Sequence, residues 1–302
     1  MKKILIAGGT GFVGKALIKH LVNCGYIVHV LTRGNNISET ENIHYFRWNI
    51  EKAVIDGKAF DGVTIIINLT GVNIGEKRWT KKRKVEIIES RIKAINLLYQ
   101  YVNRLNIGLD TFISSSAVGY YGAVTSTKIF TEISDSGDDF LASVCEQWEK
   151  AALQFENSDI ATTILRKGVV LGKEGGMYQK LAPLAKWGIN IALGNGRQFL
   201  PWIDIRDLVR LYEFILQTDE IRGVFNVVSS EHITMNDFSK ILLQSFRKTS
   251  ILPNAPAFLI QLLLGEMSVM LLEGSKVSNE KLKKAGFQFE YNTIEKSLFG
   301  LK

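Results

Sequence analysis

The chain opens with apolar and polar positions arranged as in a β-strand, an α-helix and a second β-strand. The short apolar run at residues 4–7 predicts a strand. After a glycine-rich turn, apolar residues at helical spacing predict an amphipathic helix that ends near Cys24. The β-branched run at residues 27–31 predicts the second strand. Together these elements form a β-α-β unit, which indicates a parallel sheet.

Further apolar runs alternate with helical segments through most of the chain. Uninterrupted runs of this kind suit strands that are covered on both faces, as in a parallel sheet with helices on either side. The predicted strands lie at residues 63–71, 109–116, 162–172 and 223–230, and the predicted helices at residues 82–103, 140–152 and 234–242. The pattern therefore predicts an α/β fold with a doubly wound parallel sheet.

Three glycines lie between the first strand and the first helix, at the spacing of a dinucleotide-binding turn. Gly8, Gly11 and Gly14 would let the backbone turn tightly, approach a pyrophosphate and seat the helix on the sheet. The phosphate would lie at the helix N-terminus, where N–H groups point outward. We therefore expect a Rossmann-type domain whose cofactor site includes the glycines and the neighbouring Thr10, Phe12 and Val13.

The end of the second strand predicts which dinucleotide binds. An Asp or Glu about 20 residues after the glycines would bind the ribose 2′-hydroxyl of NAD(H). This chain instead has Thr32 and Arg33, followed by Gly34. A guanidinium can hold a 2′-phosphate through charge-assisted hydrogen bonds, so the sequence favours NADP(H).

Small polar residues follow the later strands at the point where each strand ends. Because ligands lie outside the carboxyl ends of strands in open α/β sheets, these residues should face the cofactor. We expect Arg91 and Arg166 to contribute there as well, although Arg91 could equally form a surface salt bridge. The further candidate cofactor residues are Asn68, Leu69, Thr70, Gly71 and Ser114.

The remaining segments predict a smaller C-terminal lobe on the substrate side of the sheet. We expect residues 1–168 and 203–230 to form the NADP-binding Rossmann domain, and residues 169–202 and 231–302 to form the substrate-side lobe. The apolar run at 257–272 is shorter than the ~20 residues of a membrane span. It predicts a buried or lobe-packing helix.

Composition narrows the partners and the compartment. The net charge is +7, and the basic stretch at 76–93 is interleaved with acidic and apolar residues. That pattern favours a solvated helix face over a nucleic-acid site, and it suits an anionic small molecule. Two cysteines, four scattered histidines and the lack of a signal-like N-terminus predict no disulfide framework, no metal site, no membrane association and a cytoplasmic location.

Several motifs together resemble an atypical, epimerase-like branch of the extended short-chain dehydrogenases/reductases. They include "GGTGFVG", "NLTG", "SAVGYYG", "CEQWEKAA", "LRKGVVLGKEGG", "GNGRQFLPWI" and the tail around "EGSKVSNEKLKKAGFQF". Some members carry the label of cell-division inhibitor homologue. The resemblance covers nearly the whole chain and implies a characteristic C-terminal segment. Relatives often dimerise through the helices flanking the fifth strand, so a homodimer is also expected.

The resemblance fails at the residues that usually move the proton. In the wider superfamily, a serine at the end of the fifth strand is followed about 25 residues later by a Tyr-x-x-x-Lys pair. Ser116 matches the serine, with Ser115 as the alternative, but Phe140 and Val144 occupy the positions of the pair. These side chains cannot transfer protons.

Other residues are candidates for the missing roles, and each has a structural alternative. Tyr121 could donate the proton, although a tyrosine in a Tyr-Gly turn more often packs or forms a hydrogen bond. Tyr120 lies beside it as a candidate substrate contact. Arg197, Gln198 and Trp202 would line the substrate mouth, unless their glycine-rich loop is a simple connector.

Two functions remain open from the sequence. The first is an NADP(H)-dependent oxidoreductase or epimerase that acts on a small polar, or nucleotide-linked, substrate. The second is a module that senses NADPH without efficient chemistry, which the missing tyrosine–lysine pair supports. Retained polar strand ends and a full second lobe favour the enzyme.

Overall fold

A computed structural model describes residues 2–34, 40–218 and 221–301. Asn35 and Asn36, which follow the predicted cofactor-selecting arginine, lie outside the described residues.

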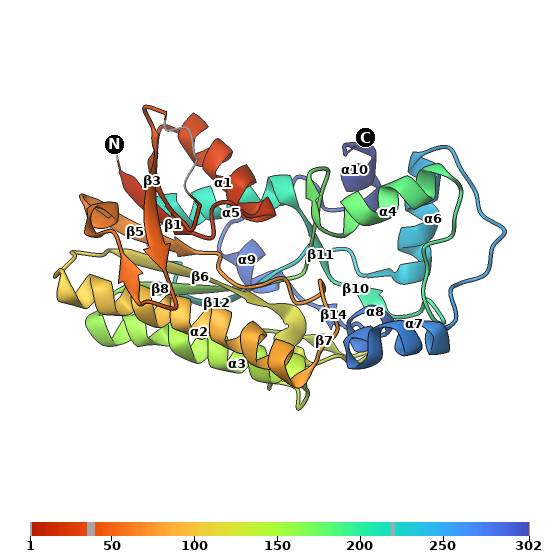
Figure 1. Cartoon of the computed structure of the whole chain (residues 1–302). Helices are drawn as coiled ribbons and strands as arrows, with labels where there is room; N and C mark the ends of the chain where they lie inside the picture. The colour runs from red at the N-terminus through yellow and green to blue at the C-terminus, as the bar shows by residue number, and fades with distance from the viewer. Residues whose placement is uncertain (1, 35–39, 219–220, 302) are drawn as a thin grey trace.

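One eight-stranded sheet organises the larger part of the molecule (Figure 1). The strand order is β12-β8-β6-β5-β1-β2-β3-β4, and every neighbouring pair is parallel except β3 with β4. The bounds are β1 Lys3–Ala7, β2 Ile27–Thr32, β3 Ile43–Asn49, β4 Val54–Ile55, β5 Val63–Asn68, β6 Thr111–Ala117, β8 Ala161–Lys167 and β12 Gly223–Val227. The order reverses between β1 and β5, which is where dinucleotides bind in such sheets. The predicted Rossmann-type α/β fold is confirmed.

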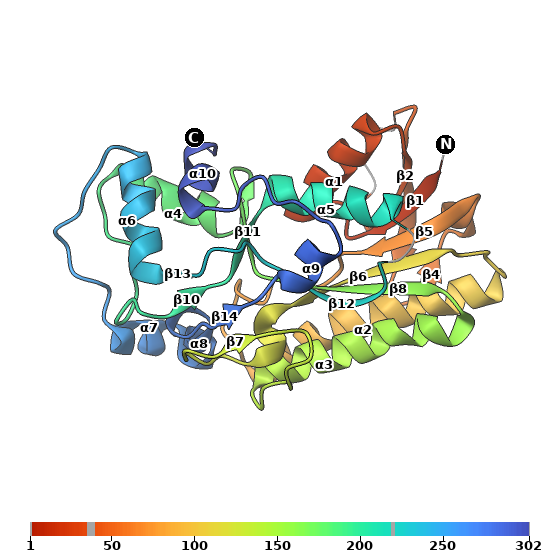
Figure 2. The ribbon, with the colours of Figure 1, turned by 180° about the vertical axis from the view of Figure 1, so that it is seen from behind.

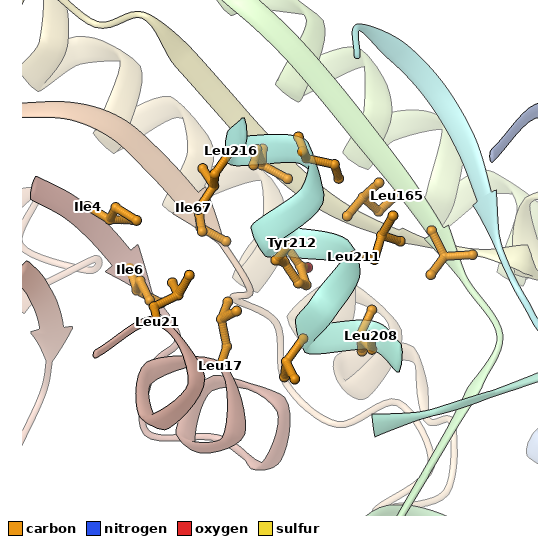
Figure 3. Close-up of a cluster of buried hydrophobic side chains, with 14 of the residues drawn as sticks. Ile4, Ile6, Leu17, Leu21, Ile67, Leu165, Leu208, Leu211, Tyr212 and Leu216 are labelled. Atoms are coloured by element: carbon orange, nitrogen blue, oxygen red, sulfur yellow. The ribbon is translucent and has the colours of Figure 1, made fainter. Parts of the chain in front are cut away.

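Helices cover both faces of this sheet because strand residues alternate sides. Ile4 and Ile6 lie in the apolar cluster under α1 (Phe12–Asn23) and α5 (Ile205–Gln217), as Figure 3 shows. Leu5 and Ala7 belong to the cluster on the opposite face. There the sheet is covered by α2 (Lys81–Arg104) and α3 (Phe140–Leu153), which run below it in Figure 1.

A smaller lobe extends from the carboxyl side of the sheet, as the view from behind also shows (Figure 2). Its core includes Trp202, Phe238 and Leu298. Its helices are α4 Gly176–Lys186, α6 Met235–Ser245, α7 Ala257–Leu264, α8 Val269–Leu272 and α10 Ile294–Phe299. Its short strands pair as β9 Val169–Gly172 with β11 Trp202–Asp204, and β10 Phe199–Leu200 with β13 Ile233–Thr234. A third pair, β7 Ile129–Phe130 with β14 Lys276–Val277, lies beside it.

The segment predicted as a strand over residues 162–172 forms two strands, β8 and β9, so the prediction is confirmed only in part. The segment is broken at Gly168, and the second half leaves the large sheet to pair with β11. A Cβ at Gly168 would lie 2.6 Å from the carbonyl oxygen of Pro201. The close approach of that backbone fixes the break, and only glycine permits it.

The predicted helix over the apolar run at 257–272 is wrong as a single buried element. Gly265, at φ +60°, separates α7 from a 3₁₀ turn and α8. No residue of α7 is buried, although Met267 after the break packs against the helices of the large domain. In the described part of the chain, no helix is long and apolar enough to cross a membrane.

The proposed division into two lobes remains a prediction, but part of the tail returns to the large domain. Leu282 of α9 (Glu280–Lys284) and Phe287 are buried in the same cluster as Ile4, although the division assigns them to the substrate-side lobe. The tail is therefore stabilised by both cores.

Candidate functional site

The glycine turn joins β1 to α1 with backbone contacts that exclude larger side chains. Gly8 has φ +85°, and a Cβ there would lie 2.8 Å from the carbonyl carbon of Leu69. A Cβ at Gly14 would lie 2.6 Å from the Cα of Gly9. Gly11 is the N-cap of α1 without a side-chain cap, so the first N–H groups of the helix point outward past Thr10. The turn has the shape that a pyrophosphate requires.

Phe12 links this turn to the second lobe. Cβ atoms at Gly172 and Gly175 would lie 2.6 and 2.5 Å from its ring atoms. The Phe12 side chain therefore occupies the space that these glycines leave, so the cofactor contact predicted for this residue would have to come from its backbone. Val13 packs against the apolar cluster below α1.

Thr32 and Arg33 lie at the carboxyl end of β2, as predicted. Thr32 is buried, and its hydroxyl accepts a hydrogen bond from the Gly34 N–H (3.0 Å). Arg33 is exposed. Its guanidinium has no hydrogen-bond or ion-pair partner among the described residues, so it is available to a phosphate.

The ends of β5 and β6 lie side by side, with Asn68 paired to Ser114. The Asn68 side-chain oxygen accepts hydrogen bonds from the Thr70 N–H and hydroxyl, at 3.2 and 2.6 Å. Its amide nitrogen is buried and has no hydrogen-bond partner in the described part of the chain. This donor is therefore available to a bound molecule.

Arg91 is buried against this edge without a carboxylate partner among the described residues. It donates to the Ile87 and Val72 carbonyls, at 2.8 and 3.2 Å, and its guanidinium lies 4.8 Å from the Trp148 ring centroid. A Cβ at Gly71 would lie 3.0 Å from the guanidinium carbon. Burial lowers the pKa of Arg91 to about 10. The predicted surface salt bridge is not formed.

Ser116 belongs to a buried polar network on the α3 face of the sheet. Its hydroxyl donates to Glu149 (2.6 Å), and Glu149 receives two further hydrogen bonds from Arg166, both 2.8 Å. Arg166 also donates to the Tyr121 hydroxyl (3.1 Å). The Tyr121 hydroxyl in turn donates to Asn226 (2.6 Å). Arg166 therefore uses its guanidinium within the protein.

The two adjacent tyrosines differ in their surroundings. Tyr121 is 2% exposed, and burial raises the pKa of its phenol. Tyr120 is partly exposed, with its ring 3.3 Å from the guanidinium carbon of Arg166. Tyr121 remains a predicted proton donor, but its hydroxyl proton is engaged by Asn226.

The positions of the missing tyrosine–lysine pair are filled by apolar packing. Phe140 meets the Trp79 ring edge-on at 5.0 Å, and Val144 is buried in the same cluster. The adjacent Cys145 is buried, which raises the pKa of its thiol to about 12. Neither Phe140 nor Val144 can move a proton.

Ser115 points to the opposite face and meets a residue that sequence reasoning missed. The Lys167 ammonium, at the end of β8, donates to the Ser115 hydroxyl (2.7 Å). Burial, with a contribution from the charge of Arg91, lowers the pKa of Lys167 to about 8. The Tyr212 hydroxyl is also buried on this face and interacts with the Ser115 side chain. The position of Lys167 next to Arg166 at a strand end was the available signal.

The predicted substrate mouth is only partly exposed. Arg197 is exposed on the glycine-rich loop, and its N–H donates to the Asn195 side chain (2.8 Å). Gln198 is buried and donates to the Leu193 and Leu271 carbonyls, at 3.1 and 2.8 Å, so it fixes the loop. Trp202 is fully buried in the core of the second lobe. Of the three, Arg197 alone has an exposed side chain, and its contact with a substrate remains a prediction.

A comparison with known protein families assigns the larger part of the chain. Residues 4–227 match the NAD dependent epimerase/dehydratase family. The chain belongs to that family. Residues 255–298 match a domain of unknown function, DUF1731, so the family membership includes the characteristic C-terminal segment that the sequence resemblance implies.

Relatives of this family member match along almost the whole chain. An epimerase family protein of Mycobacterium leprae is 32% identical over 98% of this chain and 94% of its own length. One of Staphylococcus aureus (strain N315) is 32% identical over 99% and 98%. The solved structure of the human epimerase family protein SDR39U1 (isoform 2) with NADPH is 27% identical, covers 99% of this chain and 98% of that one, and has a TM-score of 0.87.

Proposed function

We propose that this protein is an NADP(H)-dependent oxidoreductase or epimerase in which Ser115 and Lys167 replace the usual tyrosine–lysine pair. The observation that carries the proposal is the 2.7 Å hydrogen bond between these side chains at the carboxyl ends of two adjacent strands. The substrate is a small polar or nucleotide-linked molecule.

The residues at the sheet edge fit the cofactor. The Gly8 and Gly14 positions leave no room for a Cβ, and the α1 N-terminus is open to a pyrophosphate. Arg33 would hold a 2′-phosphate, and the unpaired amide of Asn68 would donate to the bound ligand. The NADPH in the structure of the human relative supports this choice. When bound, the dinucleotide supplies or accepts the hydride.

The side chains of Ser115 and Lys167 would transfer the proton to and from the substrate. The Lys167 ammonium donates to the Ser115 oxygen, which orients the serine proton toward a substrate oxygen outside the strand end. With a pKa of about 8, Lys167 can restore the proton that the serine gives to the substrate. In the reverse direction, the neutral amine accepts it.

Charge at the edge favours an anionic substrate. Arg91 and Lys167 are both cationic, influence one another electrostatically, and form no ion pair among the described residues. Two poorly solvated cations without carboxylates are costly unless a ligand compensates them. A carboxylate or phosphate on the substrate would do so.

The test is a screen of carbonyl compounds and nucleotide sugars for NADPH oxidation or isomerisation, followed by variants. Ser115→Ala and Lys167→Met should each lower kcat by about 10²–10⁴-fold while NADPH affinity, measured by fluorescence titration, stays unchanged. Lys150→Met, an exposed lysine on α3, is the matched control. Full activity in both site variants would remove the proposed proton route.

The second function is a sensor of NADPH, favoured by the apolar packing of Phe140 and Val144 where the usual pair would stand. It predicts tight NADPH binding with no turnover of any compound in the screen. Dimerisation through α2 and α3 remains a prediction for either function.

A further inference from the structure

Three metal-ligating side chains meet on the outer surface of the Rossmann domain, away from the carboxyl edge of the sheet. His20 lies in the last turn of α1 and Cys24 caps the C-terminus of that helix, and Glu213 faces them from α5. His20 Nε2 lies 2.6 Å from Glu213 Oε2 and 3.8 Å from Cys24 Sγ. All three ligand atoms lie within 4.8 Å of one another.

These separations approach those around a tetrahedral metal ion. With Zn–S and Zn–N bonds of about 2.3 and 2.0 Å, neighbouring ligand atoms lie about 3.5 Å apart. The sulfur-to-nitrogen distance already matches this value. The nitrogen-to-oxygen distance is that of a hydrogen bond, and it would have to widen by about 1 Å. Because His20 and Glu213 are each 25% exposed, their side chains have room to move.

The surroundings orient the ligands and leave an entry path. The Gln217 side-chain amide donates to Glu213 Oε1 (3.0 Å), which leaves Oε2 directed at His20. Hydrogen bonds of this kind to ligating groups raise metal affinity. Cys24 is exposed, so a metal ion and a water molecule as fourth ligand can reach the site.

We propose that His20, Cys24 and Glu213 form a binding site for Zn²⁺ or a similar borderline-soft divalent metal. The imidazole, thiolate and carboxylate would each supply one ligand atom, and water the fourth. Binding displaces the thiol proton and the proton shared by His20 and Glu213, so it releases protons to solvent.

A metal here would tie α1 to α5. The two helices lie side by side over one face of the sheet (Figure 3), and α1 begins at the glycine turn. Cross-linking them would stabilise the folded domain, by a free energy that grows with the logarithm of the metal concentration above the dissociation constant. The alternative is a plain ion pair between His20 and Glu213, with Cys24 as a bystander.

Thiol reactivity separates these possibilities because only two cysteines are present. Cys145 is buried, so an aromatic disulfide reagent applied to the native protein reports on Cys24. Equimolar Zn²⁺ should slow this reaction at least about tenfold. A metal-bound thiolate does not react with the reagent, so the rate falls with the fraction of protein that is free of metal. An unchanged rate would overturn the proposal.

Cobalt supplies a second, spectroscopic readout. Co²⁺ added to the metal-free protein should give the near-ultraviolet sulfur-to-cobalt charge-transfer band of a thiolate complex, with visible bands of tetrahedral intensity. Cys24→Ser should abolish the charge-transfer band, whereas the matched Cys145→Ser should retain it. A band that survives Cys24→Ser would overturn the proposal.

The other two ligands are tested by affinity. His20→Asn and Glu213→Gln should each weaken Zn²⁺ binding by at least about tenfold in calorimetric titration. Unchanged affinity in both variants would show that the thiol binds metal alone. NADPH affinity should stay the same in all of them, so failure of this proposal would leave the function proposed for the sheet edge intact.

Discussion

Two neighbouring serines on β6 occupy opposite chemical environments. Ser116 donates to Glu149 within a network in which Arg166 and Tyr121 also have their hydrogen bonds satisfied by the protein. Ser115 faces the other side of the sheet, where the Lys167 ammonium donates to it and no carboxylate among the described residues pairs with that ammonium. The cation of the first environment therefore has a carboxylate partner within the protein, and the cation of the second does not.

This difference shows why the serine aligned with the family pattern need not be the reactive one. A one-residue step along a strand reverses the side-chain direction. On the α3 face, Phe140 and Val144 pack in an apolar cluster, and the polar residues Ser116, Glu149 and Arg166 bond to one another. The residues available for chemistry lie on the other side, at the ends of β6 and β8.

The largest effect on stability is expected from removing the negative charge of Glu149 from the network that it forms with Ser116 and Arg166. Glu149→Gln leaves the buried Arg166 without its counter-charge and should lower the free energy of unfolding by about 3–5 kcal/mol. Urea denaturation measures this loss. Glu146→Gln, an exposed position on the same helix, should change stability by less than about 0.5 kcal/mol. A loss below about 1 kcal/mol for Glu149→Gln would mean that the carboxylate of Glu149 does not stabilise the buried charge of Arg166.

The next effect concerns cofactor choice at the far end of the sheet edge. Arg33→Ala should weaken NADPH binding by about 10–100-fold, the equivalent of a charge-assisted contact of about 1.5–3 kcal/mol, and leave NADH binding unchanged. Fluorescence titration with both reduced cofactors measures the change, with Arg104→Ala as an exposed-arginine control. Equal affinity of the wild-type protein for the two cofactors would contradict the assignment.

The burial of Lys167 beside Ser115 should affect the pH dependence of stability. Burial lowers the folded-state pKa of Lys167 from 10.5 to about 8, so the unfolded chain binds more protons between these values. The destabilising contribution is therefore full below pH 8 and is lost as the pH rises toward 10.5. Relative to Lys167→Met, the wild-type protein should gain about 1–3 kcal/mol over this window. A constant difference between the two proteins would show that Lys167 is not desolvated.

The smallest effect distinguishes the two phenol candidates from the proposed pair. Tyr121→Phe removes the hydrogen bond to Asn226 and should cost about 1 kcal/mol of stability, with turnover retained. Tyr120→Phe should change neither by a measurable amount. A large loss of kcat in Tyr121→Phe at unchanged stability would instead place the proton donor on Tyr121, as the sequence suggested.

Local features of the fold could be predicted from the sequence, and contacts between distant segments could not. The glycine turn and the polar ends of β5 and β6 depend on residues close together along the chain. The Lys167–Ser115 contact joins positions 52 residues apart, and the His20–Glu213 contact joins positions 193 apart. The break at Gly168 depends on the backbone of Pro201, which no local pattern reveals.

The packing of Phe12 against the glycines of the β9–α4 turn has an evolutionary consequence. Phe12, the first residue of α1, packs directly against Gly172 and Gly175 of the second lobe. Any enlargement on either side requires a compensating reduction on the other, so these two segments are constrained to change together.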